Sequence, residues 1–239
     1  MKVDAITDAE GTFARVGEVF PSVRSSEEWW LPFNATLIRN GDVTVLVDTG
    51  IGPKPREFVP EPEGRLLDEL ARLGVAPGDV DVIVHTHLHV DHVGWDGAFP
   101  NARYVVHEDD WRFFMSEESL AARPHLREKV QPLPRVELVR DEQEVAPGVR
   151  VFPTPGHTPG HMSVHAGSLV VLGDVVVHQL QVADPDIVYV SDHDPAAAAE
   201  MRRRVLRELA DSGASALVSH FDGAGRFERV GKGFRWAVE

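Results

Sequence analysis

The chain has 239 residues, and its 24 Lys and Arg stand against 38 Asp and Glu, which gives a formal net charge of −14. A surface this acidic repels phosphate backbones, so nucleic acid is not an expected partner. Because the sequence has no Cys, no apolar stretch long enough to span a bilayer and no signal-peptide pattern at its start, we expect a single cytoplasmic domain over residues 1–239, without membrane contact or disulfides.

The first half of the chain alternates β-rich runs with helical ones. Asn40-Gly41 separates two β-rich runs and is a strong signal for a hairpin turn. A stripe of Leu side chains predicts a helix over residues 63–73, which Gly74 ends. The strands predicted in this half span residues 34–39 and 43–47, a run that ends at His85, and residues 103–106.

In the second half, the clearest helix spans residues 195–210, because its apolar side chains share one face. We expect its three consecutive Arg side chains, from Arg202 to Arg204, to face solvent. Two shorter helices are expected at residues 108–115 and 120–130. Residues 112–134 interrupt the strand pattern and are the expected lid or substrate-selecting element. The predicted strands are residues 136–139, 149–152, 162–165, 169–172, 216–219, 226–230 and 234–238.

The run His87-Leu88-His89-Val90-Asp91-His92 follows a predicted strand and places three imidazoles and one carboxylate within six residues. Neutral imidazole and carboxylate are the usual ligands of zinc and similar metals, which take about four or five donors each. A chain without metal would gain nothing from such crowding, because the groups lose solvation and repel when protonated. His157, Asp174 and His220 follow at long intervals, and this makes seven candidate ligands. The set is too large for one ion and predicts a two-metal hydrolytic site.

This pattern resembles that of the metallo-β-lactamase superfamily, and the agreement in order and spacing extends from Asp48-Thr49-Gly50 to His220. The resemblance implies an α/β fold, the αββα sandwich of two mixed β-sheets flanked by helices. It also implies a role for each candidate ligand. One metal would be held by His87, His89 and His157, the other by Asp91, His92 and His220, and Asp174 would bridge the two.

Two divalent ions, expected to be zinc with manganese, iron or cobalt as alternatives, would lower the pKa of a bridging water so that hydroxide attacks the substrate. Asp91 is a candidate catalytic residue that accepts the proton of this nucleophile and passes it to the leaving alkoxide. His178, four residues after Asp174, is a candidate donor to the developing oxyanion. His161 is expected to support a ligand, and Asp48 is either such a support or a plain turn residue.

The remaining histidines are expected to lie away from the metals. His85 is interpreted as a hydrogen-bonded support. Ordinary surface or loop positions are expected for His107, His125, His165 and His193. Aromatic side chains near the ligand segments predict an apolar wall for a substrate pocket. They are Trp29, Trp30, Phe33, Trp95, Trp111, Phe113, Phe114 and Phe221.

Asp174 argues against β-lactams as the main substrate, because metallo-β-lactamases themselves have Cys or no bridging carboxylate at this position. The chain resembles most the lactonase and methyl parathion hydrolase-like group, which implies hydrolysis of a small lactone or ester, with phosphotriesters and aryl esters as an alternative. Quorum-quenching lactonases often have Tyr three residues after the bridging Asp, where this chain has Val177. Three other functions stay open: a mononuclear iron oxidoreductase similar to persulfide dioxygenases, a nuclease and a vestigial binding module. Whether the chain forms a homodimer also stays open.

Overall fold

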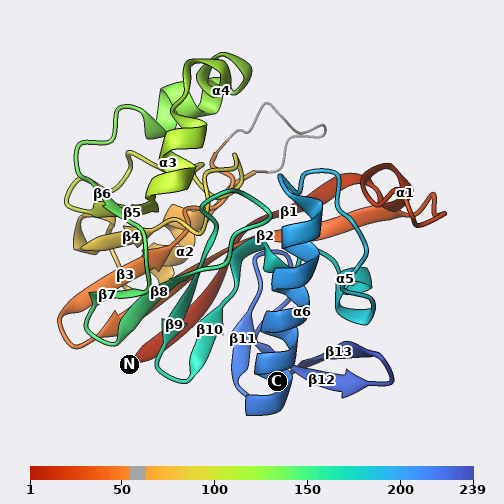
Figure 1. The fold of residues 1–239 in the computed structure, drawn as a ribbon. Coiled ribbons are helices and arrows are strands. Elements are labelled where there is room, and N and C mark those ends of the chain that lie inside the picture. Colours follow the sequence, from red (N-terminus) through yellow and green to blue (C-terminus); the bar gives the residue numbers. More distant parts are fainter. Residues whose placement is uncertain (54–62) are drawn as a thin grey trace.

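The structure is a computed structural model that describes residues 1–53 and 63–239. Two β-sheets pack face to face, and helices cover the outer face of each sheet (Figure 1). This is the αββα sandwich predicted from the sequence, so the prediction of the fold is confirmed. Within these residues no helix combines the length and the apolar character needed to cross a membrane.

The first sheet consists, in spatial order, of β1 (Lys2–Arg15), β2 (Glu28–Asn40), β3 (Val43–Val47), β4 (Val82–Val84), β5 (Arg103–His107) and β6 (Val136–Val139). β1, β2 and β3 are antiparallel neighbours, whereas β3 to β6 run parallel to one another. The segments that begin at Asp48 and His85 therefore leave this sheet at the same edge.

The second sheet consists, in spatial order, of β13 (Gly233–Val238), β12 (Gly225–Val230), β11 (Ser215–Leu217), β10 (Leu169–Val171), β9 (Met162–Ala166), β8 (Val149–Pro153) and β7 (Gln143–Ala146). Its neighbours are antiparallel except β10 and β11, which are parallel. Because the carboxyl ends of β10 and β11 lie side by side, Asp174 and His220 leave this sheet together.

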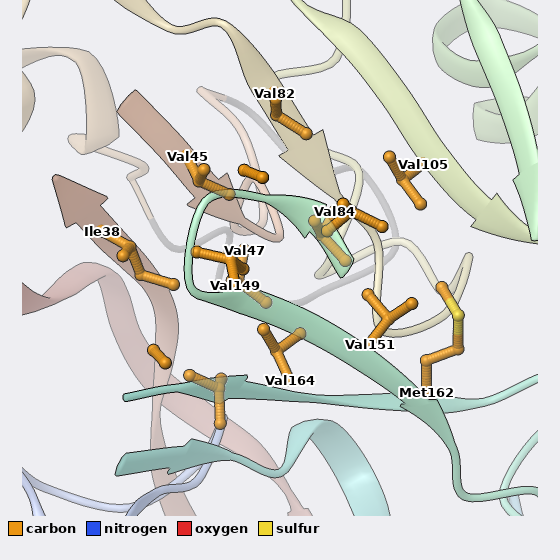
Figure 2. Close-up of a cluster of buried hydrophobic side chains, with 14 of the residues drawn as sticks. Ile38, Val45, Val47, Val82, Val84, Val105, Val149, Val151, Met162 and Val164 are labelled. Atoms are coloured by element: carbon orange, nitrogen blue, oxygen red, sulfur yellow. The ribbon is translucent and has the colours of Figure 1, made fainter. Parts of the chain in front are cut away.

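Branched aliphatic side chains from both sheets fill the space between them (Figure 2). Val45 and Val47 of β3 point into this core toward Val149 and Val164 of the second sheet. Leu46, which lies between the two valines, belongs instead to the cluster beneath the helices of the outer layer. This two-residue alternation is what a strand requires when it is buried on both faces. Each fully buried Val contributes about 1.5 to 3 kcal/mol relative to an exposed one.

The helices are α1 (Val16–Val19), α2 (Leu66–Arg72), α3 (Glu108–Phe114), α4 (Glu117–Ala122), α5 (Gln179–Ala183) and α6 (Pro195–Ser212). Single turns of other helix types lie at Pro77–Asp79, Leu126–Val130 and Gly173–Val175. The helix predicted over residues 120–130 is interrupted at Arg123: α4 ends at Ala122, and a separate helical turn follows up to Val130. Arg123 precedes Pro124 and has φ −130° and ψ 83°, and the residue before a proline is disfavoured in the helical conformation.

β1 and the first residues of β2 were not among the predicted strands. The sequence of β1 carries no regular two-residue alternation of apolar and polar side chains, and its pairing with β2 shifts register twice, between Thr7 and Ala9 and between Thr12 and Ala14. The strand therefore depends on its long antiparallel contact with β2 rather than on a pattern of its own.

The first turn of α6 offers a test of local stability. Asp194 precedes the helix, and its Oδ1 accepts hydrogen bonds from the backbone N–H groups of Ala196 at 3.1 Å and Ala197 at 3.0 Å. Asp194→Ala should lower the free energy of unfolding by about 1 kcal/mol, because two N–H groups lose their acceptor. Asp194→Ser keeps an acceptor and should cost less. Denaturant unfolding of both variants measures the difference, and equal losses would contradict a capping role.

Candidate metal centre

The candidate ligands come together at one edge of the sandwich, on segments that follow the ends of strands. Residues 87–92 follow β4, and His157 lies in the connection from β8 to β9. Asp174 follows β10 and His220 follows β11. The sheets thus fix the anchor points of four segments that are far apart in the sequence, as is common for functional loops on a rigid scaffold.

His87, His89 and His157 form the first group, with one ligand atom from each lying within 4.8 Å of the others. Nδ1 of His89 is 2.9 Å from Nε2 of His87 and 3.1 Å from Nε2 of His157. Burial lowers the pKa of His87 and of His89 well below the usual value, so both rings are neutral. Nδ1 of His157 donates to Oδ1 of Asp192 at 3.0 Å, which leaves a lone pair on its Nε2. One nitrogen from each of the three rings therefore converges on the same small region.

Asp91, His92 and His220 form the second group, again within 4.8 Å. Nδ1 of His92 donates to Oδ2 of Asp48 at 2.8 Å, and Nδ1 of His220 donates to the backbone oxygen of Pro32 at 3.0 Å. Both rings are thereby held with Nε2 directed at the cluster, the usual way in which proteins orient a histidine that binds metal. The buried Nε2 of His92 has no hydrogen-bond partner among the described residues.

Asp174 lies between the two groups. Its Oδ2 is 3.4 Å from Nε2 of His220 and 3.5 Å from Nε2 of His157, so the same oxygen faces one histidine of each group. Its Oδ1 is 3.5 Å from Nε2 of His92 and, within the part of the chain that the structure describes, accepts no hydrogen bond. A carboxylate in this position is within reach of both candidate ligand groups.

The charges of the cluster fit a cation. Burial alone would lower the pKa of His92, but the carboxylates of Asp174 and Asp91 raise it well above the usual value. The acidic side of the cluster thus attracts positive charge strongly enough to overcome desolvation. Nitrogen and oxygen donors of this kind suit zinc and similar divalent ions, and the orphaned atoms of His92 and Asp174 are the ones such ions would contact.

His161 lies behind the cluster, where the sequence predicted a support. Its Nε2 accepts the backbone N–H of Asp174 at 2.9 Å, and its Nδ1 is 2.8 Å from Oγ1 of Thr154. Burial, reinforced by the neighbouring His157, lowers the pKa of His161 to about 3, so the ring stays neutral and can accept. Since both nitrogens are engaged, neither is free to bind a metal.

His161→Ala should therefore keep two metal ions per chain at saturating metal. The affinity should fall roughly 10- to 100-fold, as is typical when a support of a ligand is removed. His161→Gln retains an acceptor and should recover part of the loss. Metal titration monitored by calorimetry measures both, and the loss of a whole ion at saturation would place His161 among the ligands.

Asp48 and His85 form a second layer beneath the ligands. Asp48 has a positive φ of 58°, and its Oδ1 accepts the backbone N–H of Thr86 at 2.7 Å while Oδ2 faces His92. The structure thus places Asp48 against a ligand rather than in a plain turn. Nε2 of His85 is 3.0 Å from Oδ2 of Asp96. Burial would lower the pKa of His85, but Asp96 and Asp48 raise it to about 9.

Sequence reasoning missed two buried carboxylates that hold the ligand segments in place. Oδ1 of Asp110 accepts the backbone N–H of Gly160 at 2.6 Å and Oδ2 accepts from Oγ1 of Thr158 at 2.8 Å, which ties the segment of His157 to α3. Asp8 of β1 accepts hydrogen bonds from the backbone N–H groups of Ile51, Gly52 and Leu66 and from Nε1 of Trp95. The sequence around a single Asp in a strand or helix does not indicate that its carboxylate is buried and hydrogen-bonded to a distant segment.

A pocket of about 230 Å³ opens onto the cluster. Trp29 and Phe33, which were predicted pocket residues, line it with Phe13 and Leu31. Its polar lining beyond the ligands consists of Arg123, His125, Tyr189 and Ser191. His125 was expected at an ordinary surface or loop position, and it is a half-buried residue that lines the pocket.

His178 does not line this pocket in the described structure. Its Nδ1 accepts the backbone N–H of Leu180 at 3.0 Å, and its ring packs against Phe20 and Trp29, with centroids 5.3 and 5.2 Å away. His178 instead lines a neighbouring pocket with His220, and its contact with an oxyanion stays a prediction.

Two expectations about surface residues are wrong. Arg202 is 1% exposed, because Asp192 and three backbone carbonyls satisfy its guanidinium, whereas Arg203 and Arg204 do reach solvent. His107 is also buried. Its Nε2 donates to the backbone oxygen of Arg140 at 2.9 Å, and its Nδ1 accepts the N–H of the first turn of α3.

An αββα sandwich with two such groups of ligands around one carboxylate defines a metal-binding enzyme. The family model of the metallo-beta-lactamase superfamily matches residues 29–218. The chain belongs to this superfamily. Among solved structures, this chain is similar to AidC, a dizinc quorum-quenching lactonase, with a TM-score of 0.83 and 22% identity. The match covers 99% of this chain and 94% of the AidC chain. The hydrolase AbOPH of the beta lactamase superfamily has a TM-score of 0.78 and 24% identity over the same shares.

Curated relatives are more similar in sequence over shorter stretches. The N-acyl homoserine lactonase AiiA of Bacillus thuringiensis subsp. kurstaki is 31% identical over 154 residues, which cover 56% of this chain and 58% of that protein. Metallo-beta-lactamase domain-containing protein 1 of Homo sapiens is 38% identical over 169 residues, which cover 68% of this chain and 53% of that protein. The matches thus span little more than half the length of these relatives.

Proposed function

We propose that this protein is a dinuclear metal-dependent hydrolase that opens a small lactone or cleaves a carboxylic ester, with zinc as the metal. One ion would be held by His87, His89 and His157, the other by Asp91, His92 and His220, and Asp174 would contact both. The observation that carries this proposal is the position of Asp174, whose Oδ2 faces histidines of both groups at 3.4 and 3.5 Å. The N-acyl homoserine lactonases among its relatives support the class of substrate.

Two divalent ions bound here would lower the pKa of a water molecule and polarise the carbonyl oxygen of the substrate. Asp91 lines the pocket and is half-buried, and its Oδ2 is 3.6 and 3.5 Å from Nε2 of His92 and His220. Its Oδ1 is the oxygen that accepts the proton of the attacking water and returns it to the leaving alkoxide. The hydrogen bonds behind the ligand rings keep the site rigid while this proton moves.

Val177 has no hydroxyl to contact the substrate carbonyl, and Tyr189 is the residue that supplies one. Its ring is stacked on His157 with centroids 6.0 Å apart and lines the pocket beside Ser191. Burial raises the pKa of Tyr189, so the phenol keeps its proton at neutral pH. We therefore assign to the Tyr189 hydroxyl the hydrogen bond to the carbonyl oxygen of the substrate.

The proposal is tested by proton release in a pH-stat with the zinc-loaded protein. Simple lactones, acyl homoserine lactones of several chain lengths and 4-nitrophenyl esters are offered in turn. Turnover that a chelator abolishes and added zinc restores is the expected result. If none of these substrates releases protons, a lactone or ester hydrolase is excluded. Oxygen consumption with a persulfide and bound iron would then identify an oxidoreductase.

A further inference from the structure

The pocket has two chemically different sides, which flank different ligand groups. The rings of Trp29 and Phe33 contact His220, with centroids 6.4 and 5.9 Å apart. On the other side, Phe114 contacts His89 with centroids 5.5 Å apart. Because His220 and His89 belong to different groups, the wall of Trp29 and Phe33 lies at one end of the cluster, whereas the other end rests on the fully buried ring of Phe114.

Arg123 adds a positive charge at the Phe114 end. Its guanidinium carbon is 5.5 Å from the ring centroid of Phe114 and 5.7 Å from that of Phe113, and its Nη1 is 3.4 Å from Oγ of Ser119. Arg123 is half-buried and lines the pocket. Two aromatic faces and one hydroxyl hold a guanidinium in place without neutralising its charge.

Within the described residues, the charge of Arg123 is not balanced by a carboxylate. No carboxylate of residues 1–53 or 63–239 forms an ion pair with Arg123, although the chain has a formal net charge of −14. Among the described residues, the carboxylates that line the pocket are those of Asp91 and Asp174, and both face histidines of the cluster. A cation held in this way beside an apolar pocket is a binding group for an anion.

We propose that the pocket selects lactones or esters that carry a carboxylate or similar anion, and that Arg123 binds this anion. The apolar part of the substrate lies against Trp29 and Phe33, and the anion lies beyond the scissile bond toward α4. This inference rests on the proposed hydrolase function and names the substrate class of the same site. The residues that supply the selectivity lie outside the ligand motif: Arg123 directly follows α4, and Trp29 and Phe33 belong to β2.

Two 4-nitrophenyl esters that differ by one terminal carboxylate test the selectivity. The glutarate monoester is the butyrate ester with a terminal carboxylate, so the ratio of their kcat/KM values isolates the anion. We expect the zinc-loaded protein to prefer the glutarate, and Arg123→Gln to lower the ratio about tenfold or more, because a charge-assisted hydrogen bond is lost. Arg123→Lys should keep part of the preference. Arg127→Gln, an exposed change in the same segment, is the matched control and should leave the ratio unchanged.

Binding of two anilides separates this inference from the proposed function. Glutaranilic acid and butyranilide resemble the two esters, and calorimetry measures their affinities without any turnover. If Arg123→Gln weakens glutaranilic acid about tenfold more than butyranilide, the anion site is supported even if no ester is cleaved. If esters are cleaved but Arg123→Gln changes neither the kinetic ratio nor the relative affinity, the anion site is overturned and the hydrolase stands.

Discussion

Replacing Asp174 by Ala should reduce the metal content from two ions per chain to at most one and lower kcat/KM roughly 1000-fold. Its oxygens lie 3.4 to 3.9 Å from Nε2 of four histidines that come from both ligand groups. Loss of the shared carboxylate removes a ligand from each ion and several kcal/mol of transition-state stabilisation, at about 1.4 kcal/mol per factor of ten. Elemental analysis after gel filtration and steady-state kinetics measure the two effects.

Two further variants show whether the charge or the shape of Asp174 matters. Asp174→Asn keeps the volume of the side chain and the backbone N–H that His161 accepts, so the loss of metal in this variant reports on charge. Asp141→Ala removes an exposed carboxylate far along the chain from the ligands and should bind metal as the unmodified protein does. Two ions per chain and unchanged kinetics in Asp174→Ala would show that the carboxylate is not a shared ligand.

The cluster could be predicted because its signal is local. Residues 87–92 supply four donors within six positions, and Asp174 and His220 each come shortly after a run of apolar residues that indicates a buried strand. A strand fixes where its last residue points, so ligands at strand ends are placed by the pattern of the strand itself. The parallel pairs of strands then bring these ends to one edge of the sandwich.

The supports of the cluster could not be predicted, because each depends on a contact between distant segments. Asp8 bonds to Trp95 and to the turn after β3, and Asp110 bonds to the segment of His157. Helical spacing places Arg202 on the same face as the buried Ala198 and Val205, but a charged residue is expected in solvent unless its partners are known, and those partners come from distant segments. A helical pattern predicts the apolar face and cannot show that one charged group at its border is enclosed.

Replacing Arg202 by Ala should cost about 3 to 5 kcal/mol of the free energy of unfolding, because it leaves the charge of Asp192 buried without its partner. The two side chains are each 1% exposed, and Nη2 of Arg202 is 3.2 Å from Oδ2 of Asp192. Nε of Arg202 also donates to the backbone oxygen of Val175 at 2.9 Å, and Nη1 donates to that of Pro185 at 2.9 Å. Thermal and denaturant unfolding of the metal-free protein measure the loss.

The same variant should weaken metal binding, since Asp192 connects Arg202 to a ligand. Oδ1 of Asp192 accepts from Nδ1 of His157 at 3.0 Å, so a carboxylate that has lost its partner no longer fixes this ring. We expect a roughly 10- to 100-fold lower affinity for metal, which a stability effect alone would not produce in the folded protein. Arg203→Ala is the matched control: the ion pair of Arg203 with Asp186 is exposed, and its loss should cost at most about 0.5 kcal/mol. If Arg202→Ala lost stability but bound metal unchanged, Arg202 would hold α6 to the sheet without orienting His157.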